Sequence, residues 1–180
     1  MSAAFRVAFN DVLSTRSERQ KNADKWVQGR YGDILKAGNI DLEANMETAK
    51  NLSTSEFIEK VKTRGDWDFK SNKLLKNQFD SSLLDEFGNF HFGMVAAAQG
   101  FSLNSTVSGA GAYQAFIQTG GNKFDSFISI TSSFAIGQDT SRVRREIMSG
   151  FSFGDNPGDS FNIMLGWDYF HINQTDTFQR

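Results

Sequence analysis

The stretch Glu86-Phe87-Gly88-Asn89-Phe90-His91-Phe92-Gly93-Met94-Val95-Ala96-Ala97-Ala98-Gln99-Gly100-Phe101 decides how this chain folds. It is apolar and rich in small residues, so we expect it to be buried. It also carries a carboxylate, an amide and one of the two histidines of the chain. Because buried polar groups are costly unless they are paired, this stretch is both the expected centre of the core and the first place to look for chemistry.

The residue spacing predicts a helix from about Glu86, with two distinct faces. The apolar face holds Phe87, His91, Val95 and Ala98. The other face is made of small residues on which a second backbone can approach closely, namely Asn89, Gly93, Ala97 and Gly100. His91 then has two interpretations, either a core histidine with a satisfied hydrogen bond or an acid or base that faces a cleft.

Length and composition indicate one domain with a packed core. A chain of 180 residues suits a single domain, and its 18 phenylalanines compensate for a hydrophobic fraction of 39%. We expect a mainly α fold, with an α+β arrangement that includes a small sheet as the alternative. Residues 1–36 are predicted to form an N-terminal helical arm or linker, and residues 37–180 a compact domain.

Several boundaries follow from local signals. The pattern Ser53-x-x-Glu56 is a capping box and predicts a helix start. Asp159 is predicted to cap a last helix. Residues 77–85 are expected to form a connection, and the serine- and asparagine-rich residues 102–108 a loop.

Composition also excludes several classes of protein. Cysteine is absent, so no disulfide or thiolate is available. The net charge of −2 lacks the basic excess of a domain that binds nucleic acid mainly through phosphates.

No apolar run has the length of a membrane span, so we expect no stable membrane insertion. The N-terminus carries no secretory signal pattern, so export would depend on another segment. Phosphate-loop and zinc motifs are missing as well, and we expect neither a metal nor a cofactor.

A second polar cluster is Arg64-Gly65-Asp66-Trp67-Asp68-Phe69-Lys70. Alternation in an extended segment would put its acids and Lys70 on one face and its two aromatic residues on the other. One interpretation is a polar cluster presented to a cleft. The other is a segment anchored by Trp67 and Phe69, with a solvated charged face.

Three stretches together resemble the bacterial polymorphic toxin type 44 domain. They are Asp66-Trp67-Asp68-Phe69-Lys70, then Phe87-Gly88-Asn89-Phe90-His91-Phe92-Gly93 running on to Gly100-Phe101-Ser102, then Gly154-Asp155-Asn156-Pro157-Gly158-Asp159 running on to Gly166. The likeness covers about residues 60–170. The chain departs from the family pattern at Phe69 and Phe92, where tyrosine is usual, and at Met94-Val95, where a threonine–glycine pair is common. Asn156 replaces an aspartate, which argues against a direct metal-ligand role for that position.

The resemblance implies a toxin domain at the end of a larger secreted protein. Such a domain is delivered into a competing bacterial cell and is neutralised in the producer by a cognate immunity protein. The implied activity is a hydrolase that cleaves RNA in the target cytosol by metal-independent acid/base catalysis. Carried onto this sequence, His91 would be the base or the acid, Lys70 would stabilise phosphate charge, and Asp66 or Asp68 would orient His91. Substrate-binding positions would be Trp67, Asn89, Asp155 and Asp159.

Two other classes remain open. A peptidoglycan hydrolase in the target periplasm would use paired carboxylates, which Glu86 with Asp66 or Asp68 could supply. In a non-enzymatic domain, Asp66, Lys70 and His91 would form a structural ion-pair network.

Overall fold

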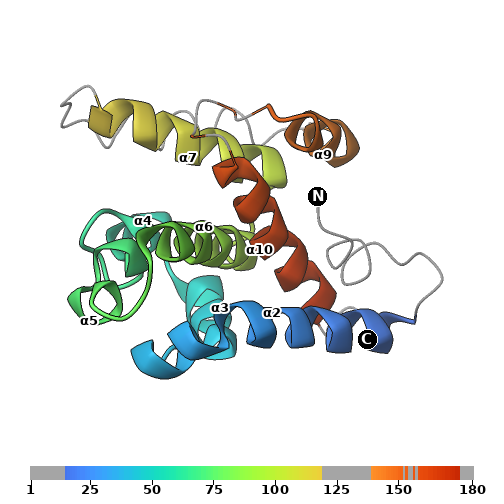
Figure 1. Ribbon diagram of the computed structural model, residues 1–180. Helices are drawn as coiled ribbons and strands as arrows, with labels where there is room; N and C mark the ends of the chain where they lie inside the picture. Colours follow the sequence, from blue (N-terminus) through green and yellow to red (C-terminus); the bar gives the residue numbers. More distant parts are fainter. Residues whose placement is uncertain (1–14, 119–138, 152, 154–155, 157, 175–180) are drawn as a thin grey trace.

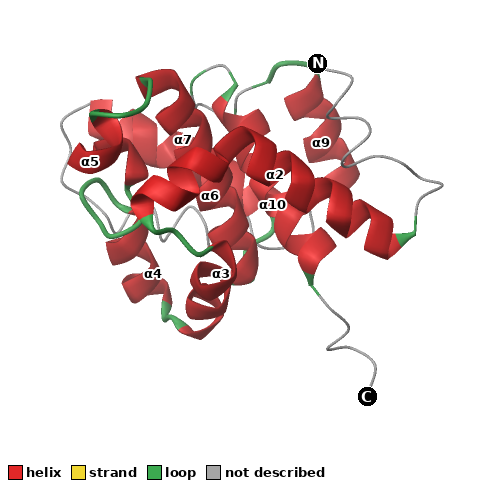
Figure 2. Cartoon of the chain, turned by 60° about the horizontal axis from the view of Figure 1, so that its bottom comes forward, coloured by secondary structure: helices red, strands yellow, loops and turns green. Residues whose placement is uncertain are grey.

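The computed structural model describes residues 15–118, 139–151, 153, 156 and 158–174. Its helices are α2 (Arg16–Gly38), α3 (Leu42–Asn51), α4 (Thr54–Val61), α5 (Lys73–Lys76), α6 (Ser81–Ala98), α7 (Leu103–Gln118), α9 (Thr140–Met148) and α10 (Asp159–Asn173), with a single 3₁₀ turn, η1 (Phe69–Ser71). These described residues contain no strand (Figure 2). The predicted mainly α class is therefore confirmed, and the small sheet of the alternative is not found in this part of the chain.

Side-chain caps explain where the helices begin. The predicted capping box of Ser53 and Glu56 is present at α4, and Thr15 and Glu18 form a second one at α2. In both, the hydroxyl accepts a hydrogen bond from a free backbone amide, and the carboxylate accepts one from the capping residue. Asp80 caps α6 through the amide of Ser82, so this helix begins at Ser81.

Three boundary predictions were wrong. The second half of the expected connection 77–85 belongs to α6, because the Asp80 cap starts the helix before Glu86. The expected loop 102–108 is the first part of α7, since the hydroxyl of Ser102 accepts a hydrogen bond from the amide of Ser105. Asp159 is the first residue of α10 rather than its cap. The cap is Gly158, in the left-handed region with φ 96°.

Helices α6 and α10 cross at the centre of the molecule, with α7 above them and α2 and α3 below (Figure 1). Two glycines allow this crossing. A Cβ atom at Gly93 would overlap the carbonyl oxygen of Ile163, and one at Gly166 would overlap the carbonyl oxygen of Phe90. The two backbones therefore touch directly, which confirms the close approach predicted for the small face of α6.

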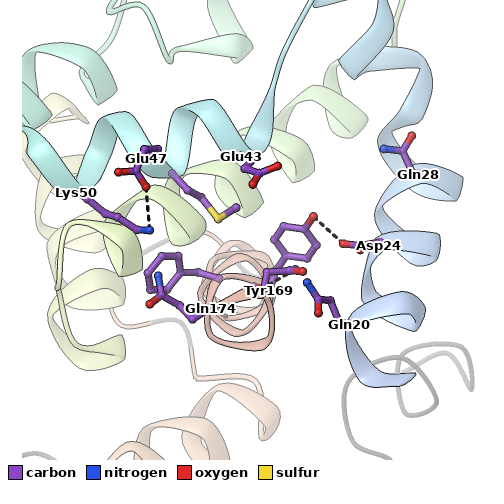
Figure 3. Close-up of a pocket in the computed structure, with 11 residues that line it drawn as sticks. Gln20, Asp24, Gln28, Glu43, Glu47, Lys50, Tyr169 and Gln174 are labelled. Carbon is purple, nitrogen blue, oxygen red and sulfur yellow. Dashed lines mark hydrogen bonds and ion pairs between the residues drawn. The ribbon is translucent and has the colours of Figure 1, made fainter. Parts of the chain in front are cut away.

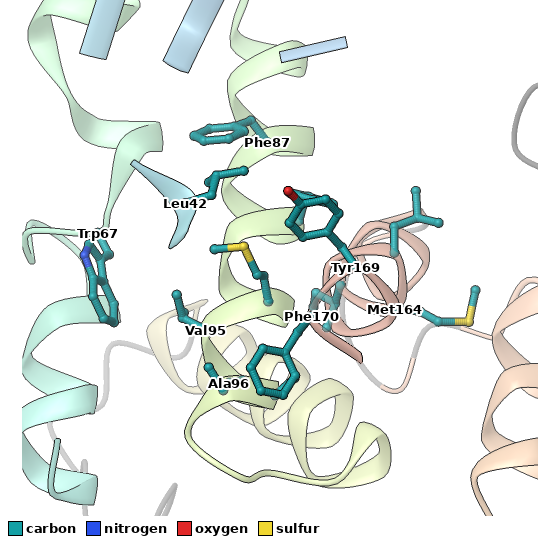
Figure 4. Close-up of a cluster of buried hydrophobic side chains, with 14 of the residues drawn as sticks. Leu42, Trp67, Phe87, Val95, Ala96, Met164, Tyr169 and Phe170 are labelled. Carbon is teal, nitrogen blue, oxygen red and sulfur yellow. The ribbon is translucent and has the colours of Figure 1, made fainter. Parts of the chain in front are cut away.

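The core surrounds this crossing (Figure 4). Phe87, Phe90 and Met94 of α6 and Ile163 and Met164 of α10 are fully buried members of this core. Val95 and Ala96 extend the same core toward the end of α6.

Helix α2 runs across the predicted boundary at residue 36. Its buried residues Ala23, Val27, Tyr31, Ile34 and Leu35 belong to the same core cluster as those of α6 and α10. The ring of Tyr31 lies 5.2 Å from the rings of both Phe87 and Phe90, measured between centroids. We therefore treat residues 16–38 as part of the folded body, and a separate role for residues 1–36 stays a prediction.

Within the described residues, no helix combines the length and the hydropathy needed to cross a membrane.

Candidate functional site

His91 lies inside the core and not in a cleft. Its side chain is 1% exposed, and its ring packs edge-on against Phe69 at 4.7 Å and Trp67 at 5.6 Å between centroids. The amide nitrogen of Asn45 in α3 lies 3.0 Å from Nε2 of His91. Because an amide nitrogen only donates, Nε2 is the acceptor and the proton of the neutral ring is on Nδ1. Burial lowers the pKa of His91 to about 3, so the ring is neutral at pH 7.

Lys70 reaches over α6 to a buried amide. Its Nζ donates to Oδ1 of Asn89 at 2.9 Å and lies 3.7 Å from Oδ1 of Asp85. The stem of the lysine crosses Gly88, where a Cβ atom would lie 2.9 Å from its carbon atoms. Gly88 thus makes room for Lys70. Asn89 is buried, and its Nδ2 atom has no hydrogen-bond partner.

Glu86 forms an ion pair with α2. Nε of Arg30 donates to Oε1 of Glu86 at 2.7 Å, the second guanidinium contact reaches Oε2, and the hydroxyl of Tyr31 donates to Oε1 at 2.9 Å. Burial works to raise the pKa of Glu86, but the hydrogen bonds from Arg30 and Tyr31 hold that pKa below its ordinary value. Glu86 is therefore a carboxylate at neutral pH.

These contacts lie next to one another on the first half of α6. Glu86 and Asn89 are three residues apart and Asp85 and Asn89 four, so they are neighbours on the helix surface. We call this set the α6 polar strip: Arg30, Lys70, Asp85, Glu86 and Asn89. Its two cations are partly exposed, with 49% of the Arg30 side chain and 35% of the Lys70 side chain open to solvent.

The remaining residues of the second polar cluster have structural partners. Trp67 is buried, and Nζ of Lys60 lies over its ring at 5.3 Å. Asp66 is exposed and pairs with Lys60 at 3.0 Å. Asp68 accepts from the backbone amides of Arg64 and Ser71 and so caps η1. Neither acid bonds to His91 or Glu86, so the described structure brings together neither the expected orienting acid nor the expected carboxylate pair.

The structure describes only part of the third motif, residues 154–159. Asp155 lies outside the described residues. Asp159 stands in the first turn of α10, where a carboxylate interacts favourably with the free amides of the helix start. Among the residues that the structure describes, no three acidic or histidine side chains gather as metal ligands do.

A further polar cluster was not predicted. Arg144 of α9 forms a two-pronged ion pair with the buried Asp168 of α10. Its guanidinium lies 5.6 Å from the ring of Trp167, and the ring of His171 lies 3.8 Å from the same ring. The separation of Trp167 and His171 by four residues was the available signal. The contact with Arg144 depends on how α9 packs, which local spacing does not reveal.

Comparison with known proteins identifies the family. A family model described as bacterial toxin 44 matches residues 56–172. This range begins inside α4 and ends inside α10, so it includes Lys70, Glu86, Asn89 and His91. Searches of curated proteins and of solved structures gave no match. The family match covers more than half of the chain and agrees with the motif resemblance, so the chain belongs to the bacterial toxin 44 family.

Proposed function

We propose that this toxin acts as the effector domain of an antibacterial polymorphic toxin system. In this proposal a larger secreted parent protein delivers it into a competing bacterium, and a cognate immunity protein protects the producer. Its membership of a bacterial toxin family supports the role.

We further propose that the toxin is a ribonuclease and that its site is the α6 polar strip. The observation that carries this proposal is the presence of two partly exposed cations along the same part of α6. Arg30 pairs with the ionised Glu86, and Lys70 pairs with Asp85. Cleavage of RNA needs a base for the 2′-hydroxyl and positive charge for the developing phosphorane. Lys70, Glu86 and Asn89 lie within the range matched by the family, whereas Arg30 precedes it.

The strip supports a reaction without a metal ion. Glu86 takes the proton of the 2′-hydroxyl, and the 2′-oxygen attacks phosphorus. The 5′-oxygen of the next nucleotide leaves and takes a proton from Lys70. The products are a 2′,3′-cyclic phosphate and a 5′-hydroxyl end. Arg30 and Lys70 stabilise the charge on the phosphate oxygens, and Asn89 holds Lys70 in position through the 2.9 Å bond.

His91 acts in this scheme as a positioning residue. Its buried ring is hydrogen-bonded to Asn45 and packs against Trp67 and Phe69, which precede Lys70 in the chain. Trp67 supports the site from the core in the same way. Asp155 and Asp159 stay substrate-binding proposals, and Asp66 and Asp68 act only through the fold of the segment before Lys70.

Hydrolysis of peptidoglycan in the periplasm is the alternative. Two carboxylates have to flank the scissile bond in that reaction. The bonds of Asp66, Asp68 and Glu86 to separate partners do not favour these three acids as the pair.

The test compares Lys70→Met with Lys62→Met in the full chain. Methionine keeps an apolar side chain over Gly88 but removes the positive charge. Lys62 is the control, because it is a lysine at the end of α4 that forms an ion pair with Glu59. We expect Lys70→Met to lower the rate of RNA cleavage about 100-fold, the scale seen when one charge-stabilising donor is removed. Lys62→Met should cleave as the wild type does, also in the presence of a chelator.

The ribonuclease proposal also predicts that toxicity depends on the compartment in which the protein is expressed. Expression in the cytosol of a bacterial host should arrest growth and degrade RNA, and Lys70→Met should weaken both effects. Killing only after export to the periplasm, with cells that round or lyse, would instead support the wall hydrolase. Full RNA cleavage by a folded Lys70→Met protein would contradict the proposed site.

A further inference from the structure

A polar groove lies on the side of α10 that faces α2 and α3 (Figure 3). Its volume is about 550 Å³. Helix α2 forms one wall, α3 forms the opposite wall, and the end of α10 supplies Tyr169 and Phe170. A second cavity of about 670 Å³ shares Gln28, Glu43 and Tyr169 with it.

The side chains of the groove combine two kinds of polar group. Four carboxamides line it, those of Gln20, Gln28, Asn173 and Gln174. Three carboxylates, those of Asp24, Glu43 and Glu47, and one ammonium, that of Lys50, also line it. Carboxamides both donate and accept hydrogen bonds, whereas carboxylates only accept. Such a set can satisfy many hydroxyl groups at once.

The charge of the groove argues against a nucleic acid as its ligand. Lys50 is already bound to Glu47 at 3.0 Å, so it offers little attraction to a phosphate. Asp24 and Glu43 stand on opposite walls of the groove (Figure 3). A polyanion would be repelled here, because like charges disfavour association.

Tyr169 connects the α2 wall to the core. Its hydroxyl donates to Oδ1 of Asp24 at 3.0 Å, and its ring packs against Phe90 at 5.6 Å between centroids. Burial, together with the nearby Asp24 and Glu43, raises the pKa of Tyr169, so the hydroxyl keeps its proton. The base of the groove is therefore a fixed tyrosine that holds one carboxylate in place.

We propose that this groove binds a neutral saccharide chain. Sugar hydroxyls match the carboxamides and carboxylates of the walls, because these groups together donate and accept hydrogen bonds. The walls on α2 and α3 lie before the family match at residues 56–172, whereas Tyr169 and Phe170 at the base of the groove lie within it. The inference goes beyond RNA cleavage and does not depend on it.

The test is a titration of the isotope-labelled full chain with chitotetraose, followed by NMR. We expect shifts confined to groove residues at millimolar saccharide. Glu43→Gln and Gln28→Ala change side chains shared by both cavities, and each should weaken binding at least about tenfold, or about 1.4 kcal/mol. Glu59→Gln makes the same change as Glu43→Gln on an exposed glutamate of α4, and it should bind as the wild type does.

Other outcomes would overturn the proposal. These are the absence of saccharide binding in a chain with wild-type thermal stability, equal binding by all variants, or binding of a basic peptide or an RNA oligonucleotide at the groove in place of the saccharide. The Lys70→Met variant separates this proposal from the ribonuclease proposal. It should bind the saccharide normally whether or not it cleaves RNA, so a failure of one proposal leaves the other separately measurable.

Discussion

At the scale of single residues, His91 illustrates how burial changes the role of a group. The sequence put it on the apolar face of α6, and the structure agrees, because Phe87, His91 and Val95 are all buried. Its partner, Asn45, lies on another helix and carries no signal of its own. A histidine that is hydrogen-bonded as a neutral acceptor and packed against Phe69 is costly to protonate.

This cost makes stability depend on pH. The pKa of His91 falls from its ordinary value of about 6.5 to about 3 in the folded chain, so between these values the unfolded state binds more protons. The contribution of His91 is complete above about pH 6.5 and is lost as the pH falls toward 3. We expect the free energy of unfolding to fall by up to about 1.4 kcal/mol per pH unit in this window.

Urea unfolding between pH 7 and pH 5, for the wild type and for His91→Leu, measures this effect. The variant should be less stable at pH 7, where it has lost the bond to Asn45, but its stability should change less with pH. An equal pH dependence in both proteins would show that other groups cause it.

At the scale of secondary-structure elements, the crossing of α6 and α10 depends on glycine. Gly93 and Gly166 each face a carbonyl of the opposite helix, so neither position has space for a methyl group. Glycine inside a helix costs about 0.5–1 kcal/mol relative to alanine. The close packing of the two helices offsets this cost.

Gly166→Ala should therefore destabilise the chain by about 3 kcal/mol or more, because the added carbon forces two backbones apart. Gly29→Ala is the matched control. It lies in α2, and nothing stands within 4 Å of the position of the added carbon. That change should raise stability by about 0.5–1 kcal/mol through helix propensity. Chemical denaturation of both variants tests the pair, and a neutral Gly166→Ala would contradict the direct backbone contact.

At the scale of the whole molecule, α2 completes both the core and the proposed sites. It buries five side chains with α6 and α10, provides Arg30 to the α6 polar strip and forms one wall of the groove. Each large apolar side chain contributes about 1.5–3 kcal/mol when fully buried. Their sum is comparable with the total stability of a typical domain, about 5–15 kcal/mol.

Removal of residues 1–38 should consequently abolish cooperative unfolding, since it exposes Phe87 and Phe90 and leaves Glu86 without Arg30 and Tyr31. Circular dichroism during a thermal scan is a sufficient measurement. A cooperative transition of the shortened chain at the wild-type midpoint would instead support a separable arm, as the boundary at residue 36 implies.

The sequence by itself determined the helical class, the position of α6 at the centre of the core, the small face that meets α10 and the toxin family. These features depend on local periodicity, on capping residues and on motifs that are contiguous in the chain. The predictions of non-helical segments at residues 77–85 and 102–108 were wrong for a local reason as well. A single capping residue, Asp80 or Ser102, starts a helix there despite the polar composition.

Only the tertiary structure decided which polar groups meet. Glu86 pairs with Arg30 across 56 residues, His91 with Asn45 across 46, and Tyr169 with Asp24 across 145. Spacing along one helix predicts which residues share a face, but it does not contain the packing that brings another helix against that face. For the same physical reason, the burial of His91 and the groove between α2, α3 and α10 became visible only in the folded chain.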